Sequence, residues 1–185
     1  AYIANSSALD DLDCFSMFGT NSFNLVWEKV CAEVMDNQLQ KPIGGLRLPV
    51  PLTEQYRDMR HKKLIDLIDK PQWSGTAPNG EAFVKQAEDT LIPDLISIVN
   101  VDGDYQFIIF DAKYYNIQLE HNKKLRGQPG IESITKQYLY QLAYQPFVEA
   151  HQIGTVRNCF LMPTSSAEIV EKGTVSLDML SKLGL

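Results

Sequence analysis

The stretch DLISIVNVDGDYQFIIFDAK, residues 94–113, decides the fold. Two runs rich in β-branched and aromatic residues lie on either side of the dipeptide Asp102-Gly103. That dipeptide is favoured in two-residue hairpin turns, because both central residues of such a turn take positive φ. The pattern therefore predicts an antiparallel hairpin made of strands over 94–101 and 104–115.

The register of this hairpin brings three charged side chains together. If the turn has two residues, Val101 pairs with Asp104, and Asp94 then lies opposite Asp111. Side chains opposite each other on one face have Cβ atoms roughly 4.5–5.5 Å apart. Strand alternation puts Lys113 on the same face as Asp111. The sequence thus predicts two carboxylates and one ammonium group in a single patch.

Two carboxylates at that distance repel each other unless a cation offsets their charge. Magnesium prefers oxygen ligands and is commonly held by one or two carboxylates while it keeps several waters. We therefore expect Asp94 and Asp111 to bind Mg²⁺ for phosphodiester hydrolysis, with Lys113 orienting water or neutralising charge on the phosphorane. A three-residue loop would shift the register and separate the carboxylates. The alternative interpretation is that Asp94 only begins a strand, Asp111 only ends one and Lys113 is a solvated edge residue.

The segments around the hairpin predict helices and one further strand. Helices are expected from the spacing of apolar residues over 23–34, over 56–69 and from about 132 to at least 144, and a core strand over 155–162. The first helix carries one continuous apolar stripe. Pro146 is expected to end or kink the last helix. The glycines and prolines between 70 and 80 indicate a loop.

Length and composition indicate a single globular domain over 1–185. Because the chain begins without Met and ends on Leu-Gly-Leu, we expect it to be part of a longer protein. It has no signal peptide pattern and no apolar stretch long enough to span a bilayer, so we expect a cytoplasmic protein. Cys14, Cys31 and Cys159 lack metal-site spacing and are expected to be reduced thiols.

The net charge of −6 is not typical of a nonspecific nucleic-acid binder, which usually has a basic face. A nuclease remains compatible with it, because acidic metal ligands contribute to the charge and a partner can supply much of the grip on DNA. The sequence has no P-loop, no Gly-x-Ser-x-Gly and no dinucleotide-binding glycine motif. His61, His121 and His151 are too scattered to suggest a zinc site.

The motif Ile92-Pro93-Asp94, followed by Asp111-Ala112-Lys113 in an apolar strand, resembles the signature of the PD-(D/E)xK nuclease superfamily. The resemblance implies an α/β restriction-endonuclease-like core, with a mixed central sheet flanked by helices. It also implies that the two acids bind magnesium and that the lysine assists hydrolysis.

Two further residues enter through the same resemblance. Glu28, which follows Trp27 on the first helix, is expected to contact the metal or an ordered water. Gln137 is expected to support the active site from the later helix, with Tyr140 as the second candidate. The alternatives are a solvated glutamate and an ordinary amphipathic helix surface.

Additional motifs resemble the LlaJI-type restriction endonuclease family, which is itself similar to McrC, the nuclease subunit of a modification-dependent restriction complex. They are Phe18-Gly19-Thr20, Phe23 to Glu28, Lys70-Pro71-Gln72-Trp73, Thr90 to Asp94, Asp111 to Tyr115 and Ile134 to Tyr140. The resemblance implies cleavage of double-stranded DNA by the catalytic subunit or domain of a restriction system. Target selection, and any GTP-driven motor, would then reside in a partner specificity subunit or NTPase.

Two basic groups are candidates for phosphate contacts, because DNA affinity is largely electrostatic. They are Lys123, Lys124 and Arg126, and the earlier cluster Arg57, Arg60, Lys62 and Lys63. The alternative for each group is a solvated face. Two other functions stay open: a structure-directed nuclease such as a junction resolvase, and a non-catalytic assembly subunit with a nuclease fold.

Overall fold

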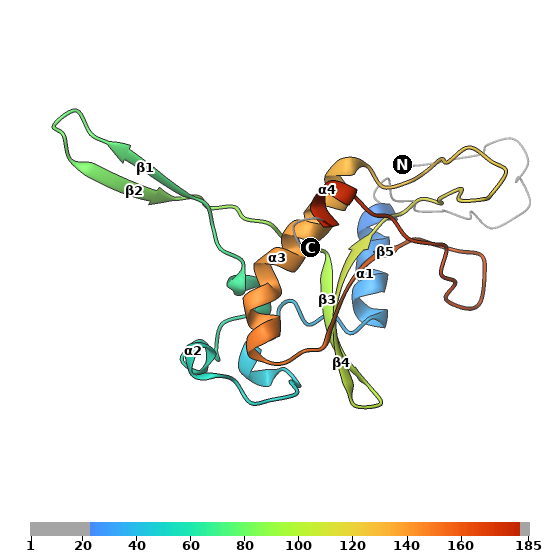
Figure 1. The fold of residues 1–185 in the computed structure, drawn as a ribbon, viewed down its shortest axis with the longest axis horizontal. Helices are drawn as coiled ribbons and strands as arrows, with labels where there is room; N and C mark the ends of the chain where they lie inside the picture. Colours follow the sequence, from blue (N-terminus) through green and yellow to red (C-terminus); the bar gives the residue numbers. More distant parts are fainter. Residues whose placement is uncertain (1–22, 182–185) are drawn as a thin grey trace, which may run out of the picture.

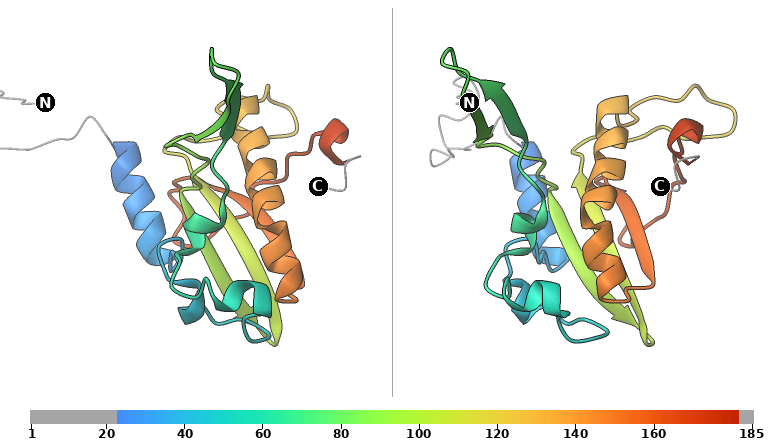
Figure 2. Two further views of the ribbon diagram at one scale, coloured as in Figure 1. Left: turned by 90° about the vertical axis from the view of Figure 1, so that its left-hand side faces the viewer. Right: turned by 60° about the vertical axis from the view of Figure 1, so that its left-hand side comes forward.

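A mixed three-stranded sheet lies between two long helices in the computed structural model, which describes residues 23–181 (Figure 1). The strands are β3 (Leu95–Val101), β4 (Asp104–Ala112) and β5 (Thr155–Leu161). β4 is central, antiparallel to β3 and parallel to β5. The helix α1 (Phe23–Val34) covers one face and α3 (Ile131–Ala150) the other, as both views in Figure 2 show. A mixed sheet between helices is the arrangement that the sequence predicted.

The hairpin has the predicted register. Val101 pairs with Asp104 across a two-residue turn, in which Asp102 has φ 52° and Gly103 φ 94°. β4 ends at Ala112, earlier than expected, although the backbone N–H of Lys113 still donates to Leu161 O of β5 at 2.8 Å. The turn therefore fixes which residues of the two strands face each other.

Alternate residues of the hairpin pack against different helices. Ile96, Ile98, Phe107 and Ile109 join the larger core cluster, to which α3 contributes Tyr140, Tyr144 and Phe147. Leu95, Phe110 and Ala112 instead form a smaller cluster with Cys31 and Trp27 of α1. Since side chains alternate along a strand, Asp111 belongs to the face covered by α3.

The segment after α1 covers the free edge of β3. The backbone N–H of Gln38 donates to Ile96 O at 2.7 Å, and Asn37 Oδ1 accepts the N–H of Ile96 at 3.1 Å. The Ser97 hydroxyl donates to Met35 O. These bonds fix the end of α1 against β3 and satisfy backbone groups that an open sheet edge would leave unpaired.

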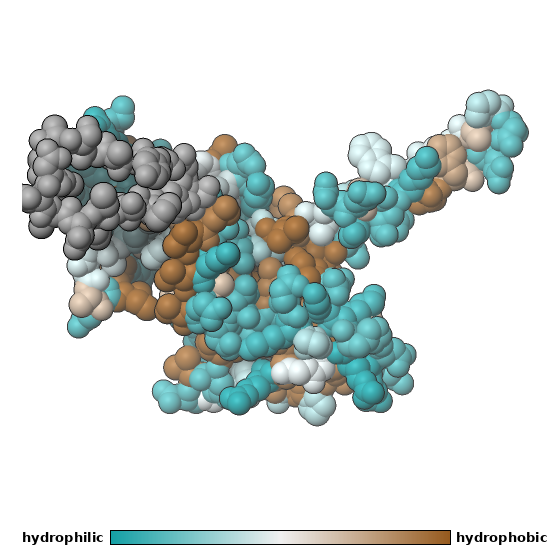
Figure 3. All heavy atoms as spheres, turned by 180° about the vertical axis from the view of Figure 1, so that it is seen from behind, coloured by the Kyte–Doolittle hydropathy of each residue, from teal (hydrophilic) through white to brown (hydrophobic). Residues whose placement is uncertain are grey.

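The apolar stripe of α1 is wider than the face that the sheet covers. Cys31 is 5% exposed, whereas Val26 and Val30 are each 46% exposed and Val34 is 72% exposed. In Figure 3, which views the molecule from the α1 side, hydrophobic side chains form a band along this helix. The predicted helix is therefore confirmed, and its stripe is buried only in part.

The predicted helix over 56–69 is wrong. A short helix α2 (Glu54–Arg57) and a 3-10 turn η2 (Leu64–Leu67) stand in its place. Between them, Met59, Arg60 and Lys62 each donate a backbone N–H to a carbonyl three residues earlier. At η2 the backbone instead bonds to an earlier segment: Leu64 N–H donates to Lys41 O and Ile65 N–H to Leu39 O, each at 3.0 Å. The earlier segment contains a further 3-10 turn, η1 (Ile43–Gly45).

The predicted loop over 70–80 is also wrong in part. β1 (Gln72–Thr76) and β2 (Ala82–Gln86) form an antiparallel hairpin that projects from the body as an arm (Figure 1). Nearly all of its side chains are exposed, so its sequence lacks the alternation that a half-buried strand produces.

The sequence predicted that Pro146 ends or kinks the helix. The helix α3 continues through Pro146 to Ala150, so it does not end at the proline. The residues beyond the proline, Phe147 and Val148, are buried and hold the last turn against the core.

A short helix α4 (Asp178–Ser181) follows β5. None of the helices among residues 23–181 is long and apolar enough to cross a membrane. Cys14 and the motif Phe18-Gly19-Thr20 lie outside the described residues.

Candidate functional site

Asp94 and Asp111 meet at the end of the hairpin opposite its turn. Asp94 lies one residue before β3, and the pairing of Leu95 with Phe110 places it across from Asp111. Its Oδ2 accepts the backbone N–H of Ala112 at 2.8 Å, which holds the carboxylate against β4. Asp111 is buried. The structure therefore brings together the two acids that the sequence paired.

Lys113 completes this group. Its Nζ lies 2.6 Å from Asp111 Oδ1, so alternation puts both side chains on one face as predicted. Partial burial lowers the pKa of Lys113, but its close contact with Asp111 and the charges of Asp111 and Asp94 outweigh that effect and raise the pKa above its ordinary value. The lysine is therefore a cation at neutral pH, suited to stabilising negative charge and unsuited to accepting a proton.

Burial, together with neighbouring carboxylates, raises the pKa of Asp94. Burial is the main factor that raises its pKa from 3.8 to about 6; the hydrogen bond from Ala112 opposes the rise, and Asp111 and Glu28 add to it. A carboxylate held among other carboxylates in a partly buried position gains from a nearby cation. The group of Asp94, Asp111 and Glu28 therefore has an excess of negative charge that Lys113 offsets in part.

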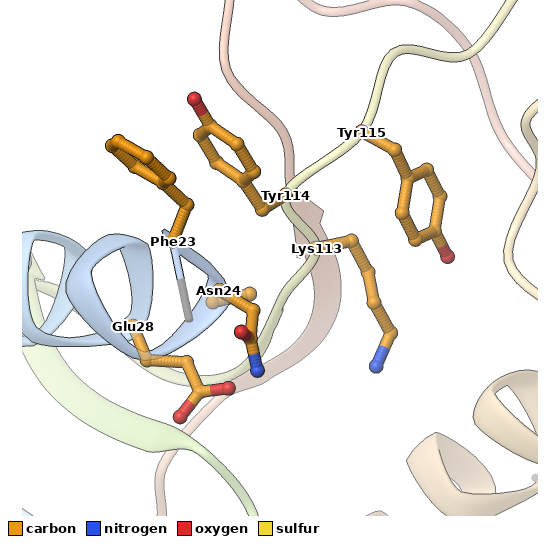
Figure 4. Close-up of a pocket in the computed structure, with 7 residues that line it drawn as sticks. Phe23, Asn24, Glu28, Lys113, Tyr114 and Tyr115 are labelled. Carbon is orange, nitrogen blue, oxygen red and sulfur yellow. The ribbon is translucent and has the colours of Figure 1, made fainter. Parts of the chain in front are cut away.

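Glu28 reaches the site from the other face of the sheet. It lines a pocket of about 380 Å³ at the end of β4, shown in Figure 4. The lining residues are Phe23, Asn24, Glu28, Ala112, Lys113, Tyr114 and Tyr115. Glu28 and Lys113 thus come from different elements and share one pocket.

The helix α3 presents a buried polar face to the site. The Tyr140 hydroxyl donates to Ile92 O at 2.9 Å, and the charges of Asp94 and Asp111 help burial raise the pKa of Tyr140 to about 12. Gln137, one turn earlier on the same buried face, is 3% exposed. Neither its amide nitrogen nor its amide oxygen has a hydrogen-bond partner in the described part of the chain. Leaving both amide atoms buried and unpaired costs about 1–3 kcal/mol.

The donor set fits a magnesium ion that is held by two carboxylates and water. Asp111 Oδ1 makes no hydrogen bond of normal geometry within residues 23–181, although Lys113 Nζ is close. No group of three or more His, Cys, Asp or Glu side chains in that range is arranged to hold a metal. Glu28 adds negative charge near Asp94, and its contact with a metal stays a prediction. Open coordination positions are what magnesium needs to contact a phosphate.

The basic groups do not gather into one face with this site. Lys123, Lys124 and Arg126 lie on the loop that leaves Lys113, and Lys123 pairs with Glu120 at 2.8 Å. Arg60 and Lys63 lie near α2, at the opposite end of the molecule (Figure 1). There, Tyr56 of α2 packs on Phe147, near the C-terminal end of α3.

The sequence reasoning missed three aromatic residues and one asparagine of the pocket. Phe23, Asn24, Tyr114 and Tyr115 line it and were not named as site residues. Two signals were present: Asn24 lies one helical turn before Glu28, and the tyrosines directly follow Lys113. Neither signal shows by itself that the two segments meet.

We expect Asp94→Asn to raise the stability of the metal-free protein at neutral pH. A carboxyl with a raised folded-state pKa binds its proton more tightly than the unfolded chain does, so stability falls as pH rises from 3.8 towards about 6. Asparagine removes this cost and can still accept the N–H of Ala112. After allowance for solvent screening the gain is on the order of 1 kcal/mol, or a Tm increase of about 2–4 °C. Thermal melts in EDTA should show the gain at pH 7.5 and none at pH 4; an equal loss at both pH values would contradict it.

The chain is similar to known restriction enzymes. Residues 54–183 match the family model described as LlaJI restriction endonuclease, a range that contains Asp94, Asp111, Lys113 and Gln137 and begins after Glu28. The chain is also similar to a Bacillus subtilis (strain 168) protein described as Type II restriction enzyme BsuMI component YdjA, with 32% identity over 167 residues. That alignment covers 89% of this chain and 30% of the relative, so the chain spans about a third of the relative's length. No solved structure matches it.

Proposed function

The chain belongs to the LlaJI restriction endonuclease family, and from that premise we propose that it is the DNA-cleaving domain of a multi-component restriction system. The reaction is magnesium-dependent hydrolysis of phosphodiester bonds in double-stranded DNA, on a PD-(D/E)xK core. Asp94, Asp111 and Lys113 are the catalytic group, and Glu28 and Gln137 assist them.

One observation carries this proposal: the two-residue turn at Asp102-Gly103 sets Asp94 opposite Asp111, with Lys113 2.6 Å from Asp111. A hydrolase for a charged diester needs hard oxygen ligands for a cation and a fixed positive charge near the phosphate. The site supplies both within one short hairpin.

Asp94 and Asp111 would hold the magnesium ion. When bound, the cation polarises the scissile phosphate and makes a nearby water more acidic. The N–H of Ala112 keeps Asp94 oriented, because it fixes Oδ2 and leaves the other oxygen free of that bond.

Lys113 acts as a cation towards the phosphate oxygen on which charge accumulates. Its raised pKa supports this role over that of a general base. Gln137 supplies an amide with both ends unpaired within the described residues, and we assign it to positioning a water or a phosphate oxygen. In other enzymes, removing one hydrogen-bond donor to a developing negative charge costs about 2.7–4 kcal/mol of transition-state stabilisation.

Target selection in this proposal lies in other components of the system. The chain has a net charge of −6, and its basic groups lie at opposite ends of the molecule. Such a distribution supplies few phosphate contacts near the cut. The relative is described as a component of a restriction enzyme, which supports a division of work among subunits.

We expect the full-length protein, combined with its partner components, to cleave linear duplex DNA in Mg²⁺ and to stop when EDTA is added. A four-way junction is the control substrate, because a junction resolvase prefers it to linear duplex. Preference for the junction would replace the restriction role with that of a structure-directed nuclease. No metal-dependent cleavage with all components present would support a non-catalytic assembly subunit.

A further inference from the structure

We propose that the pocket beside Lys113 holds an unstacked nucleobase of the strand being cut, with the Tyr114 ring as its stacking surface. The base belongs to a nucleotide next to the scissile phosphate. This inference rests on the proposed nuclease function and goes beyond it, because it adds a base-binding subsite to the catalytic group.

Aromatic rings form one wall of the pocket. Phe23 and Tyr114 are stacked, with ring centroids 5.6 Å apart and planes 15° from parallel, and Trp27 supports Tyr114 at 6.4 Å. Phe23 is nevertheless 50% exposed and Tyr114 47% exposed. A supported ring with free surface is the element that proteins use to stack single bases, and each such contact contributes about 1–3 kcal/mol.

Polar groups line the same pocket. Asn24 and Glu28 are one helical turn apart on α1, and Figure 4 shows their polar ends directed to the side where the Lys113 ammonium lies. An amide offers both a donor and an acceptor to the edge of a base, and a carboxylate accepts from exocyclic amino groups. The volume of about 380 Å³ lies in the range of small-molecule sites, which begins near 300 Å³.

The charge of the pocket favours a base over a phosphate. Among the described residues that line it, there is one ammonium, Lys113, and one carboxylate, Glu28. A second phosphate would meet the repulsion of Glu28 and find no further cation among the lining residues. A neutral aromatic base with hydrogen-bonding edges suits such a lining better.

The position of the pocket identifies which nucleotide it serves. Lys113, assigned to the scissile phosphate, and Tyr114 both line this pocket. A base attached to a nucleotide at that phosphate is therefore within reach of the Tyr114 ring. Removing a base from the duplex costs a few kcal/mol, least for a mismatched base, and stacking on the ring recovers part of that cost.

A cycle that combines protein and substrate changes tests the proposal. Single-turnover cleavage by the full-length protein with its partner components is measured on intact duplex, and on duplexes abasic at either nucleotide beside the cut. On intact DNA, Tyr114→Ala should lower the rate by about 5- to 150-fold, the range that the stacking energy implies, while Tyr114→Phe retains the rate. On one of the abasic duplexes, Tyr114→Ala should have less than about a twofold effect, because the ring has no base to contact.

Two further variants keep this test decisive. Tyr114→Leu retains apolar volume without an aromatic face and should behave as Tyr114→Ala does, which covers the case that the alanine variant unfolds. Phe83→Ala removes a partly exposed ring from the β1–β2 arm, and any effect it has should be equal on intact and abasic DNA.

An equal loss for Tyr114→Ala on all substrates, or none on any, would overturn the base-binding pocket. That outcome would assign Tyr114 to supporting α1 or to contacting a protein partner. Failure of the proposed function looks different: Asp111→Ala would then cleave both intact and abasic DNA as fast as the wild type.

Discussion

Asp111→Ala is expected to lower the rate of DNA cleavage by at least about a thousandfold, equivalent to about 4 kcal/mol of transition-state stabilisation. The Asp111 side chain lies beside both other members of the catalytic group. It faces Asp94 across the hairpin and lies 2.6 Å from Lys113. Its loss removes an expected metal ligand and releases the ammonium from its fixed position. Single-turnover cleavage at saturating Mg²⁺ measures the effect.

Asp104→Ala is the matched control for that variant. Asp104 is an aspartate at the other end of β4, exposed and paired with Val101 beside the turn. Its substitution should leave cleavage within about twofold of the wild type, because surface changes are usually small in effect. Equal rates for Asp111→Ala and Asp104→Ala would remove Asp111 from the site.

Lys113→Met is expected to lower the cleavage rate by about a hundred- to a thousandfold, with little change in DNA binding. Methionine keeps an unbranched apolar stem and removes the ammonium with its charge and its N–H donors. If the ammonium acts mainly on charge that develops during the reaction, kcat falls and KM stays nearly constant. Steady-state kinetics on duplex DNA separates the two parameters.

The control for Lys113→Met is Lys136→Met on α3. Lys136 also forms an ion pair, with Glu132 at 2.7 Å, but it is more exposed and outside the pocket. Its loss should change cleavage by less than about twofold. A rise in KM with unchanged kcat for Lys113→Met would assign the lysine to binding DNA and not to the chemical step.

The central hairpin was predictable because its determinants are local. The pair Asp102-Gly103 selects the turn, and the strand pattern then fixes every cross-strand neighbour. For that reason the sequence alone placed Asp94 and Asp111 opposite each other. The face on which they lie, and the helix that covers it, became visible only once Phe107 and Phe110 were seen in different clusters.

The elements that sequence reasoning missed depend on distant partners. The segment over 56–69 has the composition of a helix, but its backbone bonds to residues near Leu39 and Lys41. The β1–β2 arm has almost no buried face, so it leaves no periodic signal.

The choice of an assisting residue on α3 also could not be made from the sequence pattern. Gln137 and Gln141 lie four residues apart on α3, and only the packing of the helix distinguishes them. Gln137 is buried without a partner in the described chain, whereas Gln141 Oε1 accepts a hydrogen bond from Asn158. The resemblance to known nucleases, and not the helical pattern, had favoured Gln137.

Cation binding by the pair Asp94 and Asp111 tests the central claim most directly. Mn²⁺, whose free and bound forms differ in their electron paramagnetic resonance spectra, substitutes for Mg²⁺ in a titration of the full-length protein. The account predicts a site that the Asp94→Asn/Asp111→Asn double variant loses, while the Asp104→Ala control keeps it. Equal Mn²⁺ binding by the double variant and the wild type would contradict the account.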